Sequence, residues 1–219
     1  MSQKPSYPIF TDVRDRLCVV IGGGTIAERK VTRLLRSGAN VTVISPMLTR
    51  RLARHAQQGM IRHLARPFRP VDLRGAWLVI AATDDPGVNE RAFVHATRRR
   101  IFTNVVDRKP LCSFIAPAIL QRGLLTVAIS TGGASPSLAK RIRRDMERMV
   151  GDGYVPMLRL LASLRGEAKR KLSTATARRR YFDRVISGRV FELVRAGKQL
   201  EARRAATRLL AQATTRNGD

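Results

Sequence analysis

A glycine-rich turn between an apolar strand and a helix constrains the fold of this chain more than any other feature. The short apolar run LCVVI predicts a buried strand, and three glycines, Gly22, Gly23 and Gly24, follow it directly. Apolar residues then recur at helical spacing over residues 25–37. The pattern Gly22-x-Gly24-x-x-Ala27 therefore matches the fingerprint of a dinucleotide-binding turn.

Each residue type in this turn has a physical reason. Gly22 permits the tight turn, Gly24 lets the backbone approach a pyrophosphate, and Ala27 allows the helix to pack closely on the strand. The helix that begins near Thr25 offers unpaired N–H groups and the positive end of its dipole to phosphates. A tight turn in a similar fold that binds another ligand is the alternative.

The following part of the chain alternates between strand and helix patterns. Apolar runs predict further strands over 41–44, 60–64, 77–83, 101–106 and 126–130. Helical spacing and capping residues predict helices over 48–58 and 85–98. This alternation predicts an α/β architecture with a Rossmann-like, doubly wound parallel sheet.

Beyond these strands the sequence is typical of helices. Ser135 and Pro136 have the residue types of a helix cap and a first helical position. One face of this helix is expected to carry Leu138, Ile142, Met146 and Met149. The GDGYVP stretch at 151–156 is the best candidate for a hinge, and a small all-helical domain is expected after it.

The end of the second predicted strand leaves the choice between NAD and NADP open. Where an acidic residue would contact the ribose hydroxyls, this chain has Ser45, Pro46 and Met47. Ser45 or backbone groups are candidates for that contact. Arg50 and Arg51 would favour a 2′-phosphate, unless they only form a solvated helix face.

Polar residues follow three later strands. They are Thr83 and Asp84, then Asn104 to Asp107, then Ser130, Thr131, Gly132 and Gly133. Because the carboxyl ends of parallel strands meet at the ligand crevice, we expect contacts with cofactor or substrate there. Asp107 follows an apolar strand, so it is either a general base or cation ligand, or it caps a turn or pairs with Arg108.

The sequence predicts neither a resident metal site nor a disulfide framework. Two cysteines, Cys18 and Cys112, are too few for a Cys-rich zinc site, and Cys112 is expected to be an inert thiol. The three histidines, His55, His63 and His95, share no metal-ligand spacing.

The chain is strongly basic. Its 42 lysines and arginines against 16 acidic residues give a formal charge of +26, and 35 of the basic residues are arginine. This balance predicts an anionic ligand, although genome composition also raises arginine content. With 5% aromatic residues and no nucleic-acid motif, nucleic acid is disfavoured as that ligand. No long apolar run or signal peptide is found, which predicts a cytoplasmic protein without a membrane partner.

Four ordered motifs resemble the precorrin-2 dehydrogenase and sirohydrochlorin ferrochelatase family, which also forms the N-terminal part of siroheme synthase. The motifs are GGGTIAERK from Gly22, AATDDPGVN from Ala81, NVVD from Asn104 and ISTGGASPSLAKRIR from Ile129. The resemblance runs from about Tyr7 to about residue 210.

The resemblance implies an activity. Family members oxidise precorrin-2 to sirohydrochlorin with NAD⁺, and bifunctional members also insert Fe²⁺ to give siroheme, so a dehydrogenase without chelatase activity is the alternative. Asp107 matches the aspartate proposed to act in both steps. The implied substrate carries eight carboxylates, which arginine side chains could bind. A non-catalytic NAD sensor and a nucleic-acid-binding protein are the rival hypotheses.

The resemblance also implies ligand contacts. Family positions that contact NAD are matched by Thr25, Ile26, Pro46 and Met47. With them we expect the cofactor-binding set to include Gly22, Gly23, Gly24, Ser45, Thr83 and Asp84. The expected substrate contacts are Asn104, Ser130, Thr131, Gly132, Gly133 and Ser135. Thr131 stands where some members carry a serine reported as phosphorylated.

The family finally implies an assembly. Its members are homodimers. The resemblance here implies an NAD-binding domain over 1–113, a dimerisation segment over 114–150 and a helical domain over 151–219 that covers the crevice. No methyltransferase domain is expected in this chain, so a separate uroporphyrinogen methyltransferase would supply the substrate.

Overall fold

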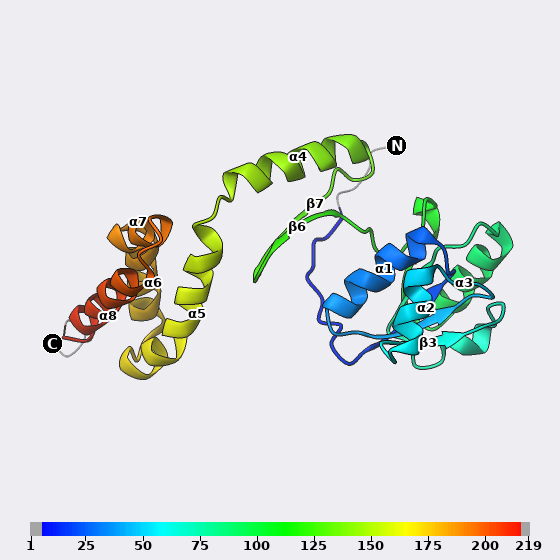
Figure 1. Ribbon diagram of the computed structural model, residues 1–219, viewed down its shortest axis with the longest axis horizontal. Helices are drawn as coiled ribbons and strands as arrows, with labels where there is room; N and C mark the ends of the chain where they lie inside the picture. Colours follow the sequence, from blue (N-terminus) through cyan, green and yellow to red (C-terminus); the bar gives the residue numbers. More distant parts are fainter. Residues whose placement is uncertain (1–5, 216–219) are drawn as a thin grey trace. The chain divides into compact units, whose positions relative to one another are not determined.

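The computed structural model describes residues 6–215, which form two compact units (Figure 1). The first unit is Ser6–Ala116, and the second comprises residues 117–215. Each unit has its own apolar core. Within residues 6–215, no helix is both long enough and apolar enough to cross a membrane.

The first unit is a five-stranded parallel sheet covered by helices. Its strands are β1 (Leu17–Ile21), β2 (Asn40–Ile44), β3 (Ile61–Leu64), β4 (Leu78–Ala81) and β5 (Phe102–Val105). They lie in the order β3-β2-β1-β4-β5. The helices are α1 (Thr25–Arg36), α2 (Arg50–Gln57) and α3 (Pro86–Arg98), with short 3₁₀ turns η1 (Pro70–Leu73) and η2 (Lys109–Leu111). This confirms the Rossmann-like architecture predicted from the sequence.

The apolar strands are continuous because both faces of the sheet are buried. Val20 of β1 lies in the same apolar cluster as Val31 of α1, whereas its neighbour Val19 lies in the cluster that contains Ala92 of α3. Successive side chains of a strand point to opposite faces, so a strand buried on both faces needs no polar alternation.

The second unit begins with a β-hairpin that corrects one prediction. The strand expected at 126–130 is β7 (Leu125–Ile129), but it lies outside the parallel sheet. It pairs antiparallel with β6 (Ala118–Arg122), a strand that was not predicted. The two strands are joined at Gly123, whose φ of +58° suits the tight turn. Two consecutive strands with a two-residue connection pair with each other rather than crossing a sheet.

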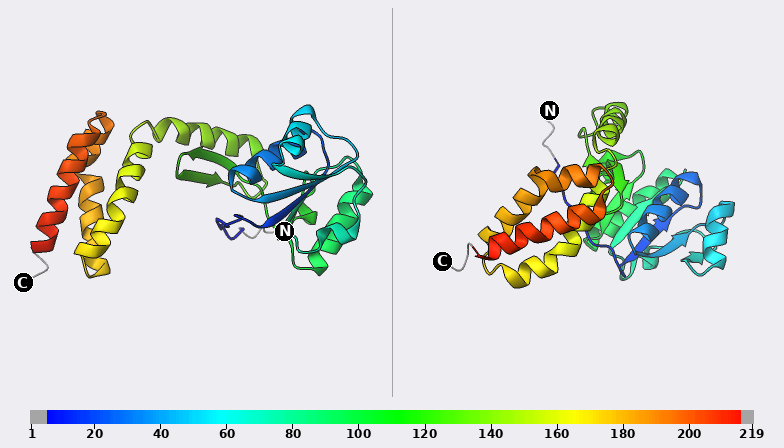
Figure 2. Two further views of the ribbon diagram at one scale, coloured as in Figure 1. Left: turned by 60° about the horizontal axis from the view of Figure 1, so that its bottom comes forward. Right: turned by 60° about the vertical axis from the view of Figure 1, so that its left-hand side comes forward.

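The remainder of the second unit is helical, as predicted. The helices are α4 (Pro136–Met149), α5 (Tyr154–Lys171), α6 (Ala175–Ser187), α7 (Arg189–Arg195) and α8 (Gln199–Thr215). Helices α6, α7 and α8 pack with α5 around an apolar cluster (Figure 2). The break between α4 and α5 falls at residues 150–153, beside the predicted hinge.

The apolar face predicted for α4 is wrong in part. Leu138 and Met149 are 50% and 73% exposed, and the buried residue within the helix is Ala139. Helix α4 packs on β6 and β7, a narrow two-stranded surface that covers only part of a helix face. The helical periodicity was therefore correct, but the extent of burial was not.

Candidate functional site

The carboxyl ends of four strands lie level at one edge of the first unit. Ile21 at the end of β1 is in register with Ile44 of β2 and with Ala81 of β4, and Ala81 is in register with Val105 of β5. The strand order reverses between β1 and β4, because β2 and β3 lie on one side of β1 and β4 and β5 on the other. Ligands of open parallel sheets bind at such a switch point.

Gly22 makes the first turn at this edge. Its φ is +115°, a conformation that residues with a Cβ rarely adopt, and its N–H donates to the carbonyl of Ile44 at 2.9 Å. A Cβ on Gly22 would lie 2.2 Å from the carbonyl oxygen of Ala82. The predicted role of Gly22 in a tight turn is therefore matched by the geometry, and the turn also brings Ala82 and Thr83 close.

Gly23 packs against the loop after β2, a role that the fingerprint did not reveal. A Cβ on Gly23 would lie 1.9 Å from the carbonyl oxygen of Met47 and 2.8 Å from Oγ of Ser45. The Gly23 carbonyl also accepts a hydrogen bond from the N–H of Thr49 at 2.9 Å. The predicted cofactor segments at 22–24 and 45–47 are thus in direct contact.

Gly24 faces open space at the start of α1. No heavy atom lies within 4 Å of a Cβ built at this position, and no side chain caps the helix. Thr25 and Ile26, the next residues, are exposed. The acidic residue of the first turn, Glu28, accepts a hydrogen bond from Oγ1 of Thr49 at 2.6 Å. This helix N-terminus, which no side chain caps, is suited to a phosphate group.

The loop after β2 presents an exposed apolar surface without an acidic side chain. Pro46 is exposed and Met47 is 79% exposed, while Ser45 is half-buried and its carbonyl is hydrogen-bonded to the ring of His63 at 2.9 Å. Arg51 lies 3.8 Å from Glu28, so it has an acidic neighbour within the fold.

The segment after β4 is held by the start of α3. Oγ1 of Thr83 is hydrogen-bonded to Oδ1 of the buried Asn89 at 3.1 Å, and the Asn89 amide donates to the Thr83 carbonyl at 2.9 Å. Asp85 caps α3 by accepting from the N–H groups of Gly87 and Val88 at 2.8 and 3.1 Å. Asp84 is exposed between these anchors.

Asp107 follows β5 at the same edge. It is exposed, its φ is +58°, and within residues 6–215 its carboxylate makes neither a hydrogen bond nor a salt bridge. The pairing with Arg108 considered from the sequence is therefore not formed. The N–H of Arg108 instead donates to the Val105 carbonyl at 3.2 Å, which closes the turn around Asp107. A strained, exposed and unpaired carboxylate is available for chemistry.

Asn104 and Cys112 fix the loop that carries Asp107. The buried Asn104 amide donates to the Phe114 carbonyl at 3.0 Å, and Sγ of Cys112 donates to the Val105 carbonyl at 3.2 Å. Burial raises the pKa of the Cys112 thiol above its usual value and outweighs the opposing effects of the Val105 hydrogen bond and the charge of Lys30. This direction fits the inert role expected for the thiol.

The remaining predicted contacts belong to the second unit, in the loop between β7 and α4. Oγ1 of Thr131 donates to the Ser135 carbonyl at 3.0 Å and accepts from the Ser135 N–H at 3.2 Å. Oγ of Ser135 caps α4 by accepting from the Leu138 N–H at 3.1 Å, and Oγ of Ser130 accepts from the Gly132 N–H at 3.2 Å. These bonds give the loop a defined conformation.

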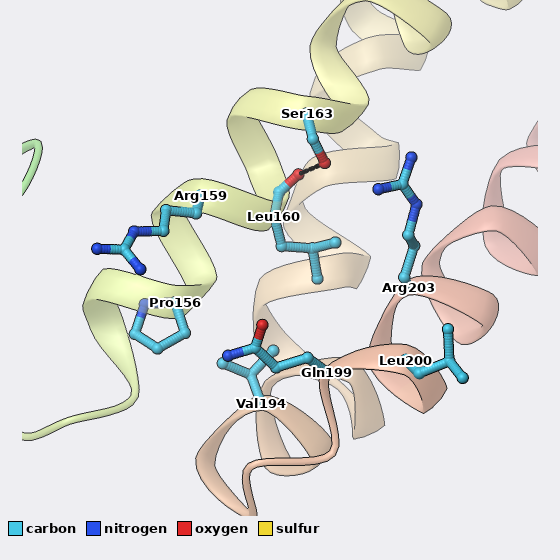
Figure 3. Close-up of a pocket in the computed structure, with 8 residues that line it drawn as sticks. All are labelled: Pro156, Arg159, Leu160, Ser163, Val194, Gln199, Leu200 and Arg203. Atoms are coloured by element: carbon cyan, nitrogen blue, oxygen red, sulfur yellow. Dashed lines mark hydrogen bonds between the residues drawn. The ribbon is translucent and has the colours of Figure 1, made fainter.

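A separate hollow of about 360 Å³ lies in the helical part of the second unit (Figure 3). Its apolar floor includes Leu160 and Val194, and Arg159 and Arg203 stand at its sides. None of the residues predicted to be catalytic, cofactor-binding or substrate-binding lines it. In the described part of the chain, no three His, Cys, Asp or Glu side chains are grouped so that they would hold a metal ion.

The sheet topology and the glycine turn define a dinucleotide-binding protein of the Rossmann type. Three family models match consecutive parts of the chain: one described as NAD(P)-binding over 9–118, one as the central part of sirohaem biosynthesis proteins over 122–149, and one as the sirohaem synthase dimerisation region over 153–210. The chain belongs to the precorrin-2 dehydrogenase and sirohydrochlorin ferrochelatase family, which is also the N-terminal module of siroheme synthase.

Individual relatives agree with this assignment. The chain is 45% identical to a siroheme synthase of Methylobacillus flagellatus over 84% of its own length, and 44% identical to one of Nitrosospira multiformis over 83%. It spans only 39% of the length of each of these curated relatives. A solved structure named SirC, precorrin-2 dehydrogenase, matches with a TM-score of 0.76 and 26% identity, over 93% of this chain and 100% of that chain.

Proposed function

We propose that this protein oxidises precorrin-2 to sirohydrochlorin and transfers the hydride to NAD⁺. The observation that carries the proposal is the meeting of the loops after β1, β2 and β4 at one sheet edge, with the unpaired carboxylate of Asp107 after the next strand. Family membership and the similarity to SirC over its full length support it.

The residues at this edge have different roles in cofactor binding and proton transfer. The open N-terminus of α1 at Gly24 binds the pyrophosphate, and the loop from Ser45 to Met47 contacts the ribose side of the cofactor. When bound, the nicotinamide accepts a hydride. Asp107 accepts the proton that the macrocycle loses with the hydride, so precorrin-2 and NAD⁺ give sirohydrochlorin, NADH and a proton.

The same carboxylate also fits a second step, insertion of Fe²⁺ into sirohydrochlorin. Metal insertion requires loss of pyrrole protons, and Asp107 assists that loss. The macrocycle supplies four nitrogen ligands to the iron, so no protein metal site is needed for this step. The second candidate function is oxidation of precorrin-2 without insertion of Fe²⁺.

The proposal includes partners and a location. The helical unit, which matches the family's dimerisation region at 153–210, forms a homodimer. The role of the segment 114–150 in dimerisation and the domain boundaries near 113 and 150 remain predictions. A uroporphyrinogen methyltransferase supplies the substrate, nucleic acid is not a partner, and the activity is cytoplasmic.

The test is Asp107→Ala and Asp107→Asn, with Glu90→Gln as a control for loss of an exposed carboxylate on α3. NADH formation from precorrin-2 and NAD⁺, and Fe²⁺ insertion into sirohydrochlorin, are measured separately. We expect Asp107→Ala to lower NADH formation about 10²-fold or more while NAD⁺ binding and the oligomeric state are kept. Turnover near that of the unmodified protein would remove Asp107 from the mechanism.

The wild-type measurements separate the alternatives. If the protein forms NADH but does not accelerate Fe²⁺ insertion into sirohydrochlorin, it is a dehydrogenase without chelatase activity. A folded protein that binds NAD⁺ but forms no NADH from precorrin-2 favours the NAD sensor. Tight, salt-sensitive binding to duplex DNA, without an effect of NAD⁺ on thermal stability, favours the nucleic-acid-binding protein.

A further inference from the structure

Helix α1 carries a lysine for which the mechanism above has no role. Lys30 lies at the edge of the buried face formed by Ala27, Val31 and Leu34, and its side chain is half-buried. Within the described chain, no hydrogen bond or ion pair shorter than 4.0 Å engages its ammonium group. An ammonium group removed from water without a partner is unfavourable, so this position favours a ligand that supplies one.

The acidic residue of the same helix does not supply this partner. Glu28 is hydrogen-bonded to Oγ1 of Thr49 at 2.6 Å and lies 3.8 Å from Arg51. Both of these contacts are with residues of the segment after β2. Lys30 and Glu28 therefore engage different neighbours of the helix.

Helix α1, which carries Lys30, lies on the same side of the sheet as the turn that carries Asp107. Val106, the residue before Asp107, packs against the apolar cluster that contains Ala27 and Val31 of α1. Asp107 and Cys112 from that loop lie near enough to interact electrostatically with the ammonium group of Lys30.

The other charges around Lys30 make its surroundings positive. Burial lowers the pKa of Lys30, and the guanidinium groups of Arg33 and Arg29 on the same helix lower it further, while Asp107 and Cys112 act in the opposite direction. Since Lys30 has two guanidinium groups and one carboxylate among the charges that act on it, a further anionic group beside its ammonium would be stabilised.

We propose that Lys30 binds a carboxylate of the tetrapyrrole substrate and so orients the macrocycle against Asp107. This inference rests on the proposed function. The cofactor phosphates are the other anions in the proposed site, but they would lie at the open N-terminus of α1 near Gly24, about 9 Å along the helix from Lys30. The turn that carries Asp107, by contrast, lies on the same side of the sheet as α1. Lys30 is thus a specificity residue for the substrate rather than for NAD⁺.

The variants that test this are Lys30→Met, which keeps length without charge, and Lys30→Arg, which keeps the charge. Arg36→Met removes an exposed cation from the last turn of the same helix and is the matched control. We expect Lys30→Met to raise the KM for precorrin-2 and the Kd for sirohydrochlorin about tenfold or more. The Kd for NAD⁺ should change less than twofold, and Lys30→Arg should keep most of the substrate affinity.

A measurement on the unmodified protein makes the test independent of how the variants fold. Lysine acylation is followed by mass spectrometry in the presence of sirohydrochlorin or NAD⁺, and sirohydrochlorin is expected to protect Lys30 while NAD⁺ is not. Equal protection by NAD⁺, or sirohydrochlorin affinity within twofold of wild type in Lys30→Met, overturns the inference. If wild-type protein neither binds sirohydrochlorin nor oxidises precorrin-2, the proposed function itself has failed. Normal wild-type turnover with an unaffected Lys30→Met variant refutes only the role of Lys30.

Discussion

Substitution of the neighbouring glycines Gly23 and Gly24 separates cofactor binding from folding. At Gly24, φ is −80° and ψ is −174°, which an alanine adopts without strain, and an added methyl group meets no protein atom within 4 Å. Loss of a glycine stabilises by about 0.4–1 kcal/mol through the unfolded chain, and alanine is a poorer N-cap by a similar amount. Gly24→Ala should therefore fold with nearly unchanged stability.

In the proposed site, the same methyl group would stand where the pyrophosphate approaches the backbone. Loss of one hydrogen bond to a charged group costs about 1.5–3 kcal/mol, which corresponds to roughly a 10- to 150-fold rise in the Kd for NAD⁺. Gly23→Ala should instead lower the stability of the fold. Its Cβ would lie 1.9 Å from the Met47 carbonyl oxygen, so the loop after β2 must retreat, at a cost of about 1–3 kcal/mol or more.

Isothermal titration with NAD⁺ and thermal unfolding measure the two effects. Gly166→Ala, in α5 of the other unit, is the control, because its Cβ has only a side-chain contact at 3.8 Å and alanine favours a helix interior. It should raise stability and leave NAD⁺ binding unchanged. Wild-type NAD⁺ affinity in Gly24→Ala would refute the phosphate site at α1, and wild-type stability in Gly23→Ala would refute the close approach of the two loops.

Two further predictions concern stability. The hydrogen bond from Arg66 holds the pKa of the nearly buried Asp72 below its usual 3.8, so this pair stabilises the fold above that pH and loses its contribution as pH falls through the lower, folded-state pKa. Asp72→Asn should lower the free energy of unfolding at pH 7 by about 1–3 kcal/mol, and urea titrations should show a smaller loss of this free energy at acidic pH. The same loss at acidic pH as in the unmodified protein would contradict this. The buried hydroxyl of Tyr181 donates to the Ala206 carbonyl at 3.2 Å, so Tyr181→Phe should destabilise the helical unit by about 0.5–1.5 kcal/mol, and a variant at least as stable in thermal unfolding would show that this bond contributes nothing.

Local signals in the sequence were sufficient for the first unit. The apolar strands, the glycine turn and the cap formed by Asp85 and Pro86 are interactions between near neighbours in the chain, and the structure has each of them where it was predicted. The level ends of the parallel strands then follow from the alternation of strands and helices, which places the cofactor and catalytic candidates at one edge.

Contacts between segments that are distant in the chain could not be predicted from such local signals. The role of Gly23 depends on Met47, which reaches it only through the pairing of β1 with β2. The position of Lys30 depends on the turn after β5, more than seventy residues later in the chain. A lysine on a helix has the same local pattern whether it faces solvent or a carboxylate.

The class of fold, the dinucleotide turn and the family are all recognisable in the sequence, because the patterns that carry them are formed by residues close together in the chain. Which polar groups are free to act depends instead on how distant segments pack. Asn104 is committed to the Phe114 carbonyl, Thr83 to Asn89 and Glu28 to Thr49, whereas Asp107 keeps its carboxylate unpaired within the described residues. The physical reason is that hydrogen bonds and burial are properties of neighbours in space, and those neighbours are set only when the sheet and its helices pack.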